Sequence, residues 1–313
     1  MFELASKRKL WYTISLIVII PGLISLIFNG LKLGIDFTGG SLWEVSFTQP
    51  VTSEQIMQGL EAGGIDGALI QQTGPAEDNT WLIRTKELTE GSAEKDQIEA
   101  AWTESLGGYV EQEFSTVGGA VSTGIRNRAI LAVALASLGI LAYIAYAFRN
   151  TQNPLLYGSA ALVEMLHDVL LVLGVFSILG WLFGVEVDAL FVTALLTVIG
   201  FSVHDTIVVF DRIRETLAHH SDPTFEGVVN YSLAQTLVRS LNTSLTVVLT
   251  LLALYLFGGA STKTFVLALL IGVVSGTYSS IFNASQLLVS WENGEIQKLF
   301  GRGQAPAPAA AKH

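Results

Sequence analysis

Long apolar stretches that alternate with short polar segments dominate the chain. Six of these stretches come close to the length of about 20 residues that a helix needs to cross a bilayer. The pattern therefore predicts an α-helical membrane protein with six transmembrane helices, at about Leu10–Phe28, Ala129–Phe148, Leu155–Leu182, Ala189–Phe210, Leu241–Phe257 and Phe265–Val289.

Between the first two apolar stretches the periodicity changes. In Ser41–Thr48 polar and apolar residues alternate, which is typical of a half-buried strand. Thr52 and Gln55 have the spacing of a capping box at a helix N-terminus. The expected order is βαββαβ, which predicts an α+β ferredoxin-like external domain, with strands at 41–48, 68–73, 81–85 and 109–117 and helices at about 52–63 and 92–106.

The chain is thus expected to have four parts. Residues 1–33 form the cytoplasmic N-terminus and the first transmembrane helix, residues 34–125 the external domain, and residues 126–298 a five-helix transmembrane block. Residues 299–313 are rich in Pro and Ala and lack an apolar pattern, so we expect a disordered cytoplasmic tail.

Composition agrees with this organisation. Of the 313 residues 50% are hydrophobic and 14% are charged, whereas soluble domains carry roughly 25% charged residues. Residues 34–125 hold 15 acidic and 3 basic side chains, a net charge of −12 that argues against nucleic-acid binding, because phosphate contacts need a basic surface. The chain has no cysteine, so neither disulfides nor thiolate metal sites are expected.

Basic residues indicate the orientation in the membrane. Lys7, Arg8 and Lys9 precede the first helix, and when they are placed on the cytoplasmic side most other flanking basic residues also lie there. Arg126 and Arg128 fall on the outer side and oppose this assignment. We expect a multi-pass protein with both termini in the cytoplasm and an extracytoplasmic domain.

Two ionisable residues at matching depth are the first candidates for function. Asp205 lies 17 residues, or about 26 Å, from Asp188 at the outer end of its helix, and Arg239 lies 18 residues, or about 27 Å, from Phe257. If the two helices touch, Asp205 and Arg239 are placed to pair, as expected for a proton relay. Two alternatives stay open: a structural ion pair that locks the helices, and an Arg239 that extends to the membrane surface.

Polar residues also repeat along single faces of the last three long helices. Such stripes are usually contacts between packed helices, and a hydrated proton path is the alternative. In either case we expect the hydroxyls and amides to point inward. The stripes are Thr193, Thr197, Gly200 and His204; then Arg239, Thr243, Thr246 and Thr250 with Asn242 adjacent; and finally Ser275, Ser279, Asn283 and Gln286.

A second acidic cluster lies on the third apolar stretch. Glu164 and Asp168 are one helical turn apart, and His167 lies between them. Two histidines on different helices, His167 and His204, are weak evidence for a metal site. Since imidazole titrates near neutral pH, a proton-carrying or hydrogen-bonding role is the preferred hypothesis.

The segment GIDFTGGS, Gly34 to Ser41, leaves the first helix and enters the external domain. Gly39 and Gly40 allow backbone conformations that a bulkier residue resists. One interpretation is a sharp connection into the first strand. The other is a hinge between membrane and external parts, with Gly34, Asp36, Gly39 and Gly40 as its residues.

Three motifs in this order resemble the SecF family of the bacterial Sec protein-export machinery: GIDFTGGS at 34–41, HDTIVVFDRIRE at 204–215 and RSLNTSLT at 239–246. Six helices with one external domain after the first also match that family along essentially the whole chain. The resemblance implies an accessory subunit of the cell inner membrane, not an enzyme. It further implies a SecD partner related by pseudo-twofold symmetry, as in resistance-nodulation-division transporters.

For the mechanism, the resemblance implies that the chain and SecD use the proton motive force to promote export of unfolded polypeptides through SecYEG. Asp205 and Arg239 match the proton-coupling residues of the family, and His204, Asn242, Thr243, Thr246, His167 and Asp168 are the supporting polar residues. The expected partners are SecD, SecYEG, the translocating polypeptide, protons and the lipid bilayer, with no cofactor, metal or nucleic acid.

Other classes of function remain as alternatives. A proton-coupled small-molecule exporter of the resistance-nodulation-division type would share the relay, but such exporters have twice as many helices in one chain. A scaffold that clamps the translocon without coupling would need no intramembrane carboxylate. An intramembrane hydrolase is disfavoured because the sequence has no GxSxG or HExxH motif.

Overall fold

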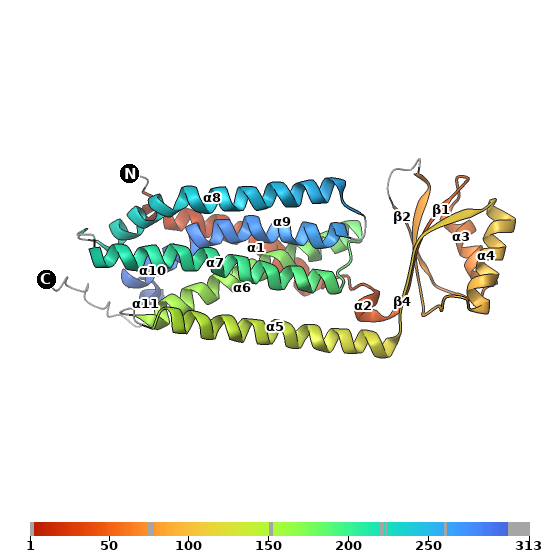
Figure 1. The fold of residues 1–313 in the computed structure, drawn as a ribbon, viewed down its shortest axis with the longest axis horizontal. Coiled ribbons are helices and arrows are strands. Elements are labelled where there is room, and N and C mark those ends of the chain that lie inside the picture. The colour runs from red at the N-terminus through yellow and green to blue at the C-terminus, as the bar shows by residue number, and fades with distance from the viewer. Residues whose placement is uncertain are drawn as a thin grey trace. The chain divides into compact units, whose positions relative to one another are not determined.

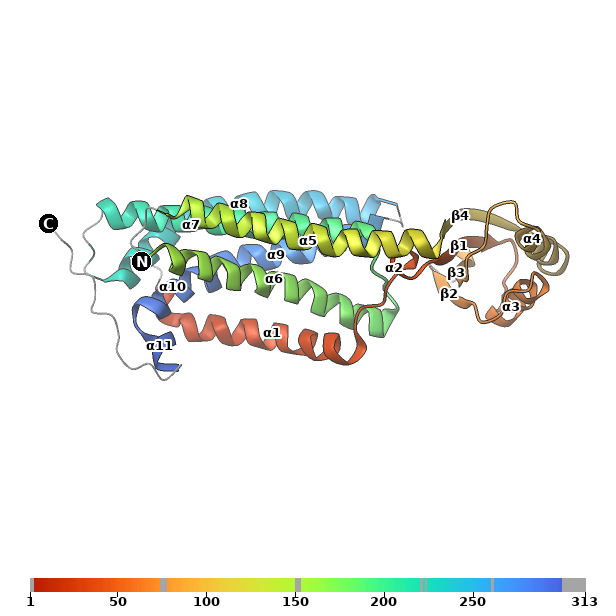
Figure 2. The same cartoon turned by 90° about the horizontal axis from the view of Figure 1, so that it is seen from below.

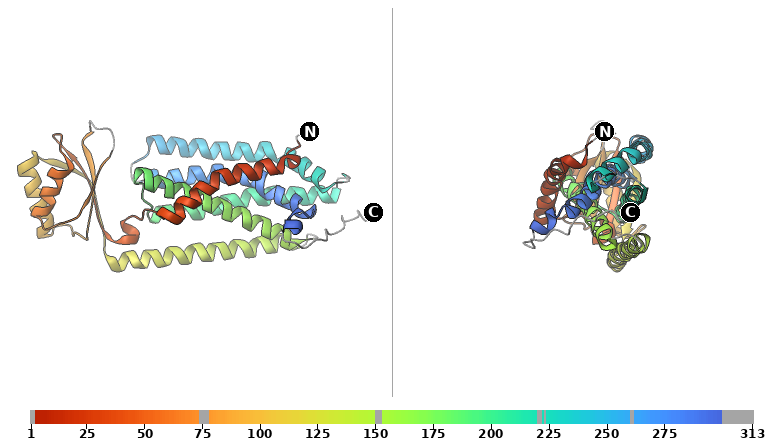
Figure 3. Two further views of the ribbon diagram at one scale, coloured as in Figure 1. Left: turned by 180° about the vertical axis from the view of Figure 1, so that it is seen from behind. Right: turned by 90° about the vertical axis from the view of Figure 1, so that its left-hand side faces the viewer.

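A computed structural model describes residues 3–73, 78–149, 153–219, 222, 224–259 and 262–299. Residues 300–313 of the expected tail lie outside this part. The chain divides into two units: Leu33–Leu131, called here the external unit, and the described residues before and after it, called the membrane unit. Figures 1, 2 and 3 draw the chain from four directions.

The described residues contain six helices long and apolar enough to cross a membrane, which confirms the predicted fold class. The helices are α1 (Arg8–Asn29), α5 (Gly119–Ala147), α6 (Pro154–Phe183), α7 (Ala189–His219), α8 (Phe225–Phe257) and α9 (Lys263–Ser279). The last of these continues through a π-helical turn, Ser280–Ala284, into α10 (Ser285–Glu292), and the short helices η1 (Ala5–Lys7) and α11 (Glu295–Leu299) lie near the two chain ends.

Several of these helices are longer than the apolar stretches predicted. The helix α5 begins at Gly119 instead of Ala129, and α8 begins at Phe225 instead of Leu241. The reason is that hydropathy detects only the segment that matches the hydrocarbon core, whereas backbone hydrogen bonds extend a helix beyond it. Apolar length therefore located the helices and missed their polar ends.

Small residues bring the helices of the membrane unit together. Helix α1 packs against α6 at Gly22 and Gly174, where an added Cβ on Gly174 would lie 2.7 Å from the Cα atom of Gly22. One turn further, the Ser25 and Ser177 hydroxyls are hydrogen-bonded at 2.8 Å. Helix α9 packs against α6, α7 and α8, so α9 is central in the bundle, as Figure 2 shows.

The external unit contains β1 (Gly40–Phe47), α3 (Ser53–Ala62), β2 (Leu69–Thr73), β3 (Thr80–Thr85), α4 (Ala93–Leu106) and β4 (Tyr109–Val117). The strands form an antiparallel sheet in the order β2-β3-β1-β4, and α3 and α4 cover one of its faces (Figure 1). The predicted βαββαβ order is confirmed. The capping box between Thr52 and Gln55 is also present at the start of α3.

Aromatic side chains fill the space between this sheet and its two helices. Trp43 and Trp102 are 1% and 0% exposed, and their ring centroids lie 4.8 Å apart. Gly59 of α3 lies directly against Trp102, since a Cβ atom there would come within 2.1 Å of the indole ring. Each unit thus has its own core, in the external unit a conventional one between sheet and helices.

Candidate functional site

Asp205 lies on the buried side of α7. The residue is 4% exposed, and its Oδ2 atom has no hydrogen-bond partner. His204, the preceding residue, is exposed. Because successive helix residues point about 100° apart, the two neighbouring ionisable groups face different surroundings.

Arg239 of α8 does not pair with Asp205 in this structure. Arg239 is exposed, and no ion pair or hydrogen bond joins these two described side chains. The predicted contact is absent because α8 turns another face inward. Its buried polar residues recur every four positions, at Ser232, Thr236, Ser240 and Ser244, and Arg239 lies about 100° from Ser240 around the helix.

Two of the three polar stripes face outward in this single chain. The predicted inward orientation is therefore wrong for these two stripes. The threonines of these stripes donate to carbonyl oxygens four residues earlier, Thr197 to Thr193 at 2.9 Å and Thr246 to Asn242 at 2.8 Å. Such internal bonds let a hydroxyl face any environment. The exposed members are Thr193, Thr197, Gly200 and His204 on α7, and Arg239, Asn242, Thr243, Thr246 and Thr250 on α8.

Three exposed side chains of these stripes, unlike the threonines, have no hydrogen-bond partner within their own helix. In the part of the chain that the structure describes, the side chains of His204, Arg239 and Asn242 make no hydrogen bond or ion pair. Hydrocarbon offers no partner to such groups, so polar side chains in membrane helices usually face protein or water. The exposed faces of α7 and α8 therefore resemble a protein–protein interface with a polar partner.

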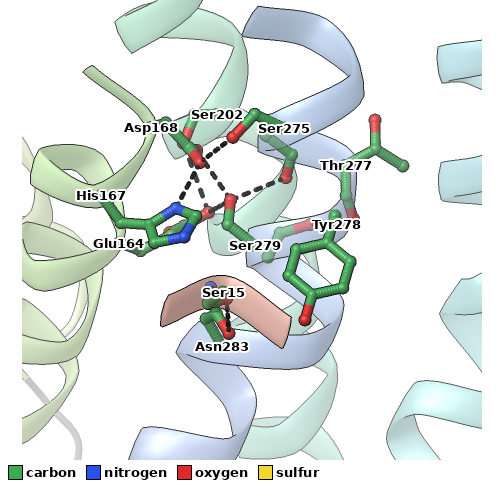
Figure 4. Close-up of polar contacts among 12 residues, drawn as sticks. Ser15, Glu164, His167, Asp168, Ser202, Ser275, Thr277, Tyr278, Ser279 and Asn283 are labelled. Carbon is green, nitrogen blue, oxygen red and sulfur yellow. Dashed lines mark hydrogen bonds and ion pairs between the residues drawn. The ribbon is translucent and has the colours of Figure 1, made fainter. Parts of the chain in front are cut away.

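A buried polar network lies between α6, α7 and α9 (Figure 4). Glu164 and Asp168, 0% and 1% exposed, come from successive turns of α6. The Ser202 hydroxyl of α7 lies 3.3 Å from Glu164 Oε1 and 2.7 Å from Asp168 Oδ2. The Ser279 hydroxyl of α9 lies 3.2 and 2.7 Å from the same two oxygens. Two hydroxyls thus bridge the two carboxyl groups.

Further side chains complete the network around these carboxyl groups. Ser275 donates to Asp168 Oδ1 at 2.7 Å, and Thr206 donates to Glu164 Oε2. The Nδ1 atom of His167 lies 3.0 Å from Asp168 Oδ1, while its Nε2 atom is buried without a partner. Each of these groups is able to donate or accept a hydrogen bond.

The sequence indicated only part of this network. Its acidic cluster, Glu164 with His167 and Asp168, is the buried centre, but Ser202 and Thr206 were missed as its partners. Their signal was a pair of hydroxyls at i and i+4, which the more conspicuous threonine stripe on the other face of α7 obscured. Among the described residues, no three His, Asp or Glu side chains are grouped closely enough to hold a metal ion.

The third predicted stripe, on the last helix, does point inward. Ser275, Ser279, Asn283 and Gln286 are all buried, which confirms that prediction. The π-helical turn lies between these serines and Gln286 and contains Asn283, whose amide nitrogen is 2.8 Å from the Ser15 hydroxyl of α1. Such π-helical turns are frequent at functional sites.

The glycine-rich motif begins the external unit. Gly34 caps the one-turn helix α2 (Ile35–Thr38), and Gly39 and Gly40 have φ angles of 76° and 112°. A Cβ atom on Gly40 would lie 2.5 Å from the carbonyl oxygen of Thr85, so glycine is required there both by φ and by space. The pair forms the turn into β1, and the hinge role of Gly34, Asp36, Gly39 and Gly40 stays a prediction.

Two family descriptions match the chain. "Protein export membrane protein SecD/SecF, C-terminal" matches residues 97–294, and "SecD/SecF GG Motif" matches residues 24–51, which include Gly39 and Gly40. The protein translocase subunit SecF of Thermobaculum terrenum is 54% identical over 316 residues, which is 99% of this chain and 100% of the relative. The SecF of Anaerolinea thermophila is 44% identical over 99% of this chain and 100% of the relative.

Solved structures of longer proteins are also similar. The crystal structure of SecDF from Thermus thermophilus, described as a translocon-associated membrane protein, superposes with a TM-score of 0.80 at 31% identity. The match covers 93% of this chain and 39% of that protein. A second SecDF crystal structure, in a super-membrane-facing form, gives a TM-score of 0.65 at 29% identity, covering 96% of this chain and 40% of the other.

Proposed function

The chain belongs to the SecD/SecF family of protein-export membrane proteins, and we propose that it is the SecF-type accessory subunit of the Sec translocase. With SecD, it uses the proton motive force to promote export of unfolded polypeptides through SecYEG. It acts as a transport subunit without catalysing a chemical reaction. Its location is the cell inner membrane, with both termini in the cytoplasm and the external unit on the periplasmic side.

The observation that carries this proposal is the state of Asp205. A carboxyl group that is 4% exposed on an apolar helix, with one oxygen lacking any partner, is costly in a bilayer unless it serves a function. Proton uptake from one side of the membrane and release to the other is the function that such a group suits. Asp205 is therefore the proposed proton carrier.

Arg239 is the proposed second element of the coupling. An ionised Asp205 attracts Arg239, and a protonated Asp205 releases it, because neutralisation removes the attraction between the two groups. The separation of the two side chains in this structure is the arrangement expected for the protonated form. Movement of α8 relative to α7 would then change the position of the external unit, which contacts the emerging polypeptide.

The exposed polar groups of α7 and α8 support a SecD partner. His204, Arg239 and Asn242 lack partners within the described chain, and a SecD half related by pseudo-twofold symmetry would supply them. Thr243 and Thr246 lie on the same exposed face of α8. In this proposal the proton path runs between two chains, and this chain alone contributes one side of it.

The test is proton-dependent completion of export. Membrane vesicles that contain SecYEG, SecD and either the wild-type chain or Asp205→Asn are given a precursor arrested after the ATP-driven steps, and completion is followed with and without a proton gradient. We expect Asp205→Asn to abolish the stimulation by the gradient. Asp211→Asn is the matched control, since Asp211 lies on the same helix but is exposed and paired with Arg214.

The outcomes separate coupling from a scaffold. If Asp205→Asn and Asp211→Asn both retain wild-type stimulation, the chain clamps the translocon without coupling, and the proton-carrier assignment is wrong. Arg239→Gln is expected to behave like Asp205→Asn. Quantification of SecD that co-purifies with each variant verifies that the loss does not come from a missing partner.

A further inference from the structure

The coupling proposed for Asp205 makes no use of the Glu164–Asp168 network, although this network contains the most deeply buried carboxyl groups of the membrane unit. Glu164 and Asp168 are 0% and 1% exposed. They lie on α6, whereas Asp205 lies on α7. Their surroundings determine how many protons they hold.

The two hydroxyls that bridge the carboxyl groups cannot donate to both of them at the same time. Ser202 and Ser279 each lie within hydrogen-bond distance of one oxygen of Glu164 and one oxygen of Asp168. A hydroxyl group has one proton, so it donates to one of the two carboxyl groups and presents a lone pair to the other. Ser279 also lies 3.2 Å from the carbonyl oxygen of Gly276, a further acceptor. A carboxyl group that carries a proton can donate to the lone pair that a bridging hydroxyl presents to it, whereas a carboxylate cannot.

No other charged group provides full compensation. On α6, His167 contacts Asp168. On α7, the residues next to Ser202 and Thr206 in the sequence include His204, which is exposed, and Asp205, which is itself acidic. On α9, Tyr278 donates its hydroxyl proton to the carbonyl oxygen of Trp11 instead. In the described part of the chain no Lys or Arg pairs with either carboxyl group. Even a protonated imidazole would therefore leave one of two ionised carboxylates without a cation.

His167 adds a ring nitrogen without a hydrogen-bond partner at the edge of the network. Its Nδ1 atom faces Asp168, whereas its Nε2 atom is buried and has no partner. Figure 4 shows the imidazole ring beside the two carboxyl groups, at the edge of the network. An unpartnered ring nitrogen in this place is the natural point at which a water molecule or a proton enters and leaves.

We propose that Glu164 and Asp168 share one proton and so form a second proton-binding site in the membrane unit, separate from Asp205. Two neighbouring carboxyl groups bridged by common hydroxyls behave as one titrating pair that holds a proton between them. The site keeps α6, α7 and α9 joined while the proton is bound, and loosens their contact when it leaves. Its role in export rests on the proposed function, but the presence of the proton does not.

Infrared spectroscopy of the full chain in lipid nanodiscs at neutral pH tests this site, because a protonated carboxyl group has a carbonyl stretching band that a carboxylate lacks. We expect wild-type protein to show such a band, with one component lost in Glu164→Gln and the same component lost in Asp168→Asn. The component is expected to remain in Asp205→Asn. Glu215→Gln, at an exposed position on α7, is the matched control and leaves the spectrum unchanged.

Each contrary result overturns the proposal. A spectrum without a protonated band at neutral pH removes the site, and a component lost in Glu164→Gln but kept in Asp168→Asn places the proton on Glu164 alone. If these variants do not accumulate in the membrane, Ser279→Ala is measured instead. Loss of a bridging hydroxyl is expected to shift the band of the protonated carboxyl group, and an unshifted band contradicts a proton shared between Glu164 and Asp168. The export assay with Asp205→Asn is independent of all these results, so failure of one proposal is distinguishable from failure of the other.

Discussion

The external unit buries a cation, whereas the membrane unit buries carboxyl groups. Lys95 of α4 is 2% exposed, and its Nζ atom lies 2.6 Å from Glu90, 3.4 Å from Glu99 and 2.9 Å from Glu111. These three carboxylates are themselves exposed or half-buried. The lysine is thus surrounded by opposite charge, and the excess negative charge faces water.

The carboxyl groups of the membrane unit lack such compensation. Glu164, Asp168 and Asp205 are at most 4% exposed, and among the described residues none of them pairs with Lys or Arg. A bilayer provides no solvent to screen an unpaired charge. The compensated Lys95 stabilises a fold, whereas we propose that the uncompensated carboxyl groups bind protons or await a partner.

Loss of the Lys95 amine is the largest stability effect that we expect. Lys95→Ala leaves Glu90, Glu99 and Glu111 without their cation and removes a side chain that lies over the Trp43 ring, at 5.0 Å from its centroid. Breaking a buried pair costs about 3–5 kcal/mol, and the lower end applies here because the carboxylates reach water. Hydrogen exchange of β1 and α4 in the full chain measures the loss.

Lys86→Ala is the matched control for that change, because Lys86 is exposed in the same unit. Equal protection in both variants would contradict a structural role for the buried lysine. The pH dependence adds a second check. Burial lowers the pKa of Lys95, but the hydrogen bonds that its ammonium group donates to Glu90 and Glu111 raise it, with a net increase above its ordinary value of 10.5. The stabilisation is therefore complete below this ordinary value and is lost as the pH rises through the higher folded-state pKa.

The contact between α1 and α6 tests how close approach of two glycines holds helices of the membrane unit together. Gly174→Ala would place a Cβ atom 2.7 Å from the Cα atom of Gly22, and overpacking of this kind costs about 1–3 kcal/mol. We expect a lower thermal midpoint of the full chain in detergent. Gly158→Ala on the same helix is the control, since no atom lies within 4 Å of its added Cβ; a similar loss there would refute the steric explanation.

The smallest change in stability that we expect concerns Glu44 and Glu113, two like charges that face each other in the external unit. The two residues are directly opposite in the β1–β4 pair, and burial together with the Glu113 charge raises the pKa of Glu44. Glu44→Gln removes this repulsion and should stabilise the unit by about 0.2–1 kcal/mol at neutral pH.

The sign of the pH dependence is specific for this pair. Since the folded-state pKa of Glu44 is raised, the wild-type unit gains stability as the pH falls through that value, and the advantage of Glu44→Gln disappears. Denaturation at neutral and acid pH measures both. An advantage that persists at acid pH, or an equal gain from Asp66→Asn in an exposed loop, would show that repulsion between the two glutamates is not the cause.

Periodicity predicted the fold well because burial repeats with the geometry of each element. The six apolar helices and the βαββαβ order follow from local patterns of about 5 to 20 residues, which a single segment contains. The same holds for the Thr52–Gln55 capping box and for the positive φ angles at Gly39 and Gly40. These features depend on neighbours in the sequence.

The candidate site was predicted less completely, since helical periodicity gives faces but not which face meets which helix. On α8 the conspicuous stripe with Arg239 is exposed, and the modest one with Ser240 and Ser244 is buried. Both have helical spacing, so the sequence cannot rank them. Glu164 and Asp168 were visible as an acidic pair, but Ser202 and Ser279, 34 or more residues away, became their partners only through packing.

The sequence by itself determined the long apolar helices, the α+β domain after the first of them and the presence of ionisable groups within apolar helices, because hydropathy and spacing are properties of one segment. The tertiary structure decided that Asp205 is buried without Arg239, that Glu164 and Asp168 share two hydroxyls, and that the polar faces of α7 and α8 are uncovered in this chain. The physical reason is that a hydrogen bond between side chains depends on a separation of about 3 Å, and only the rotation and packing of whole helices set that distance.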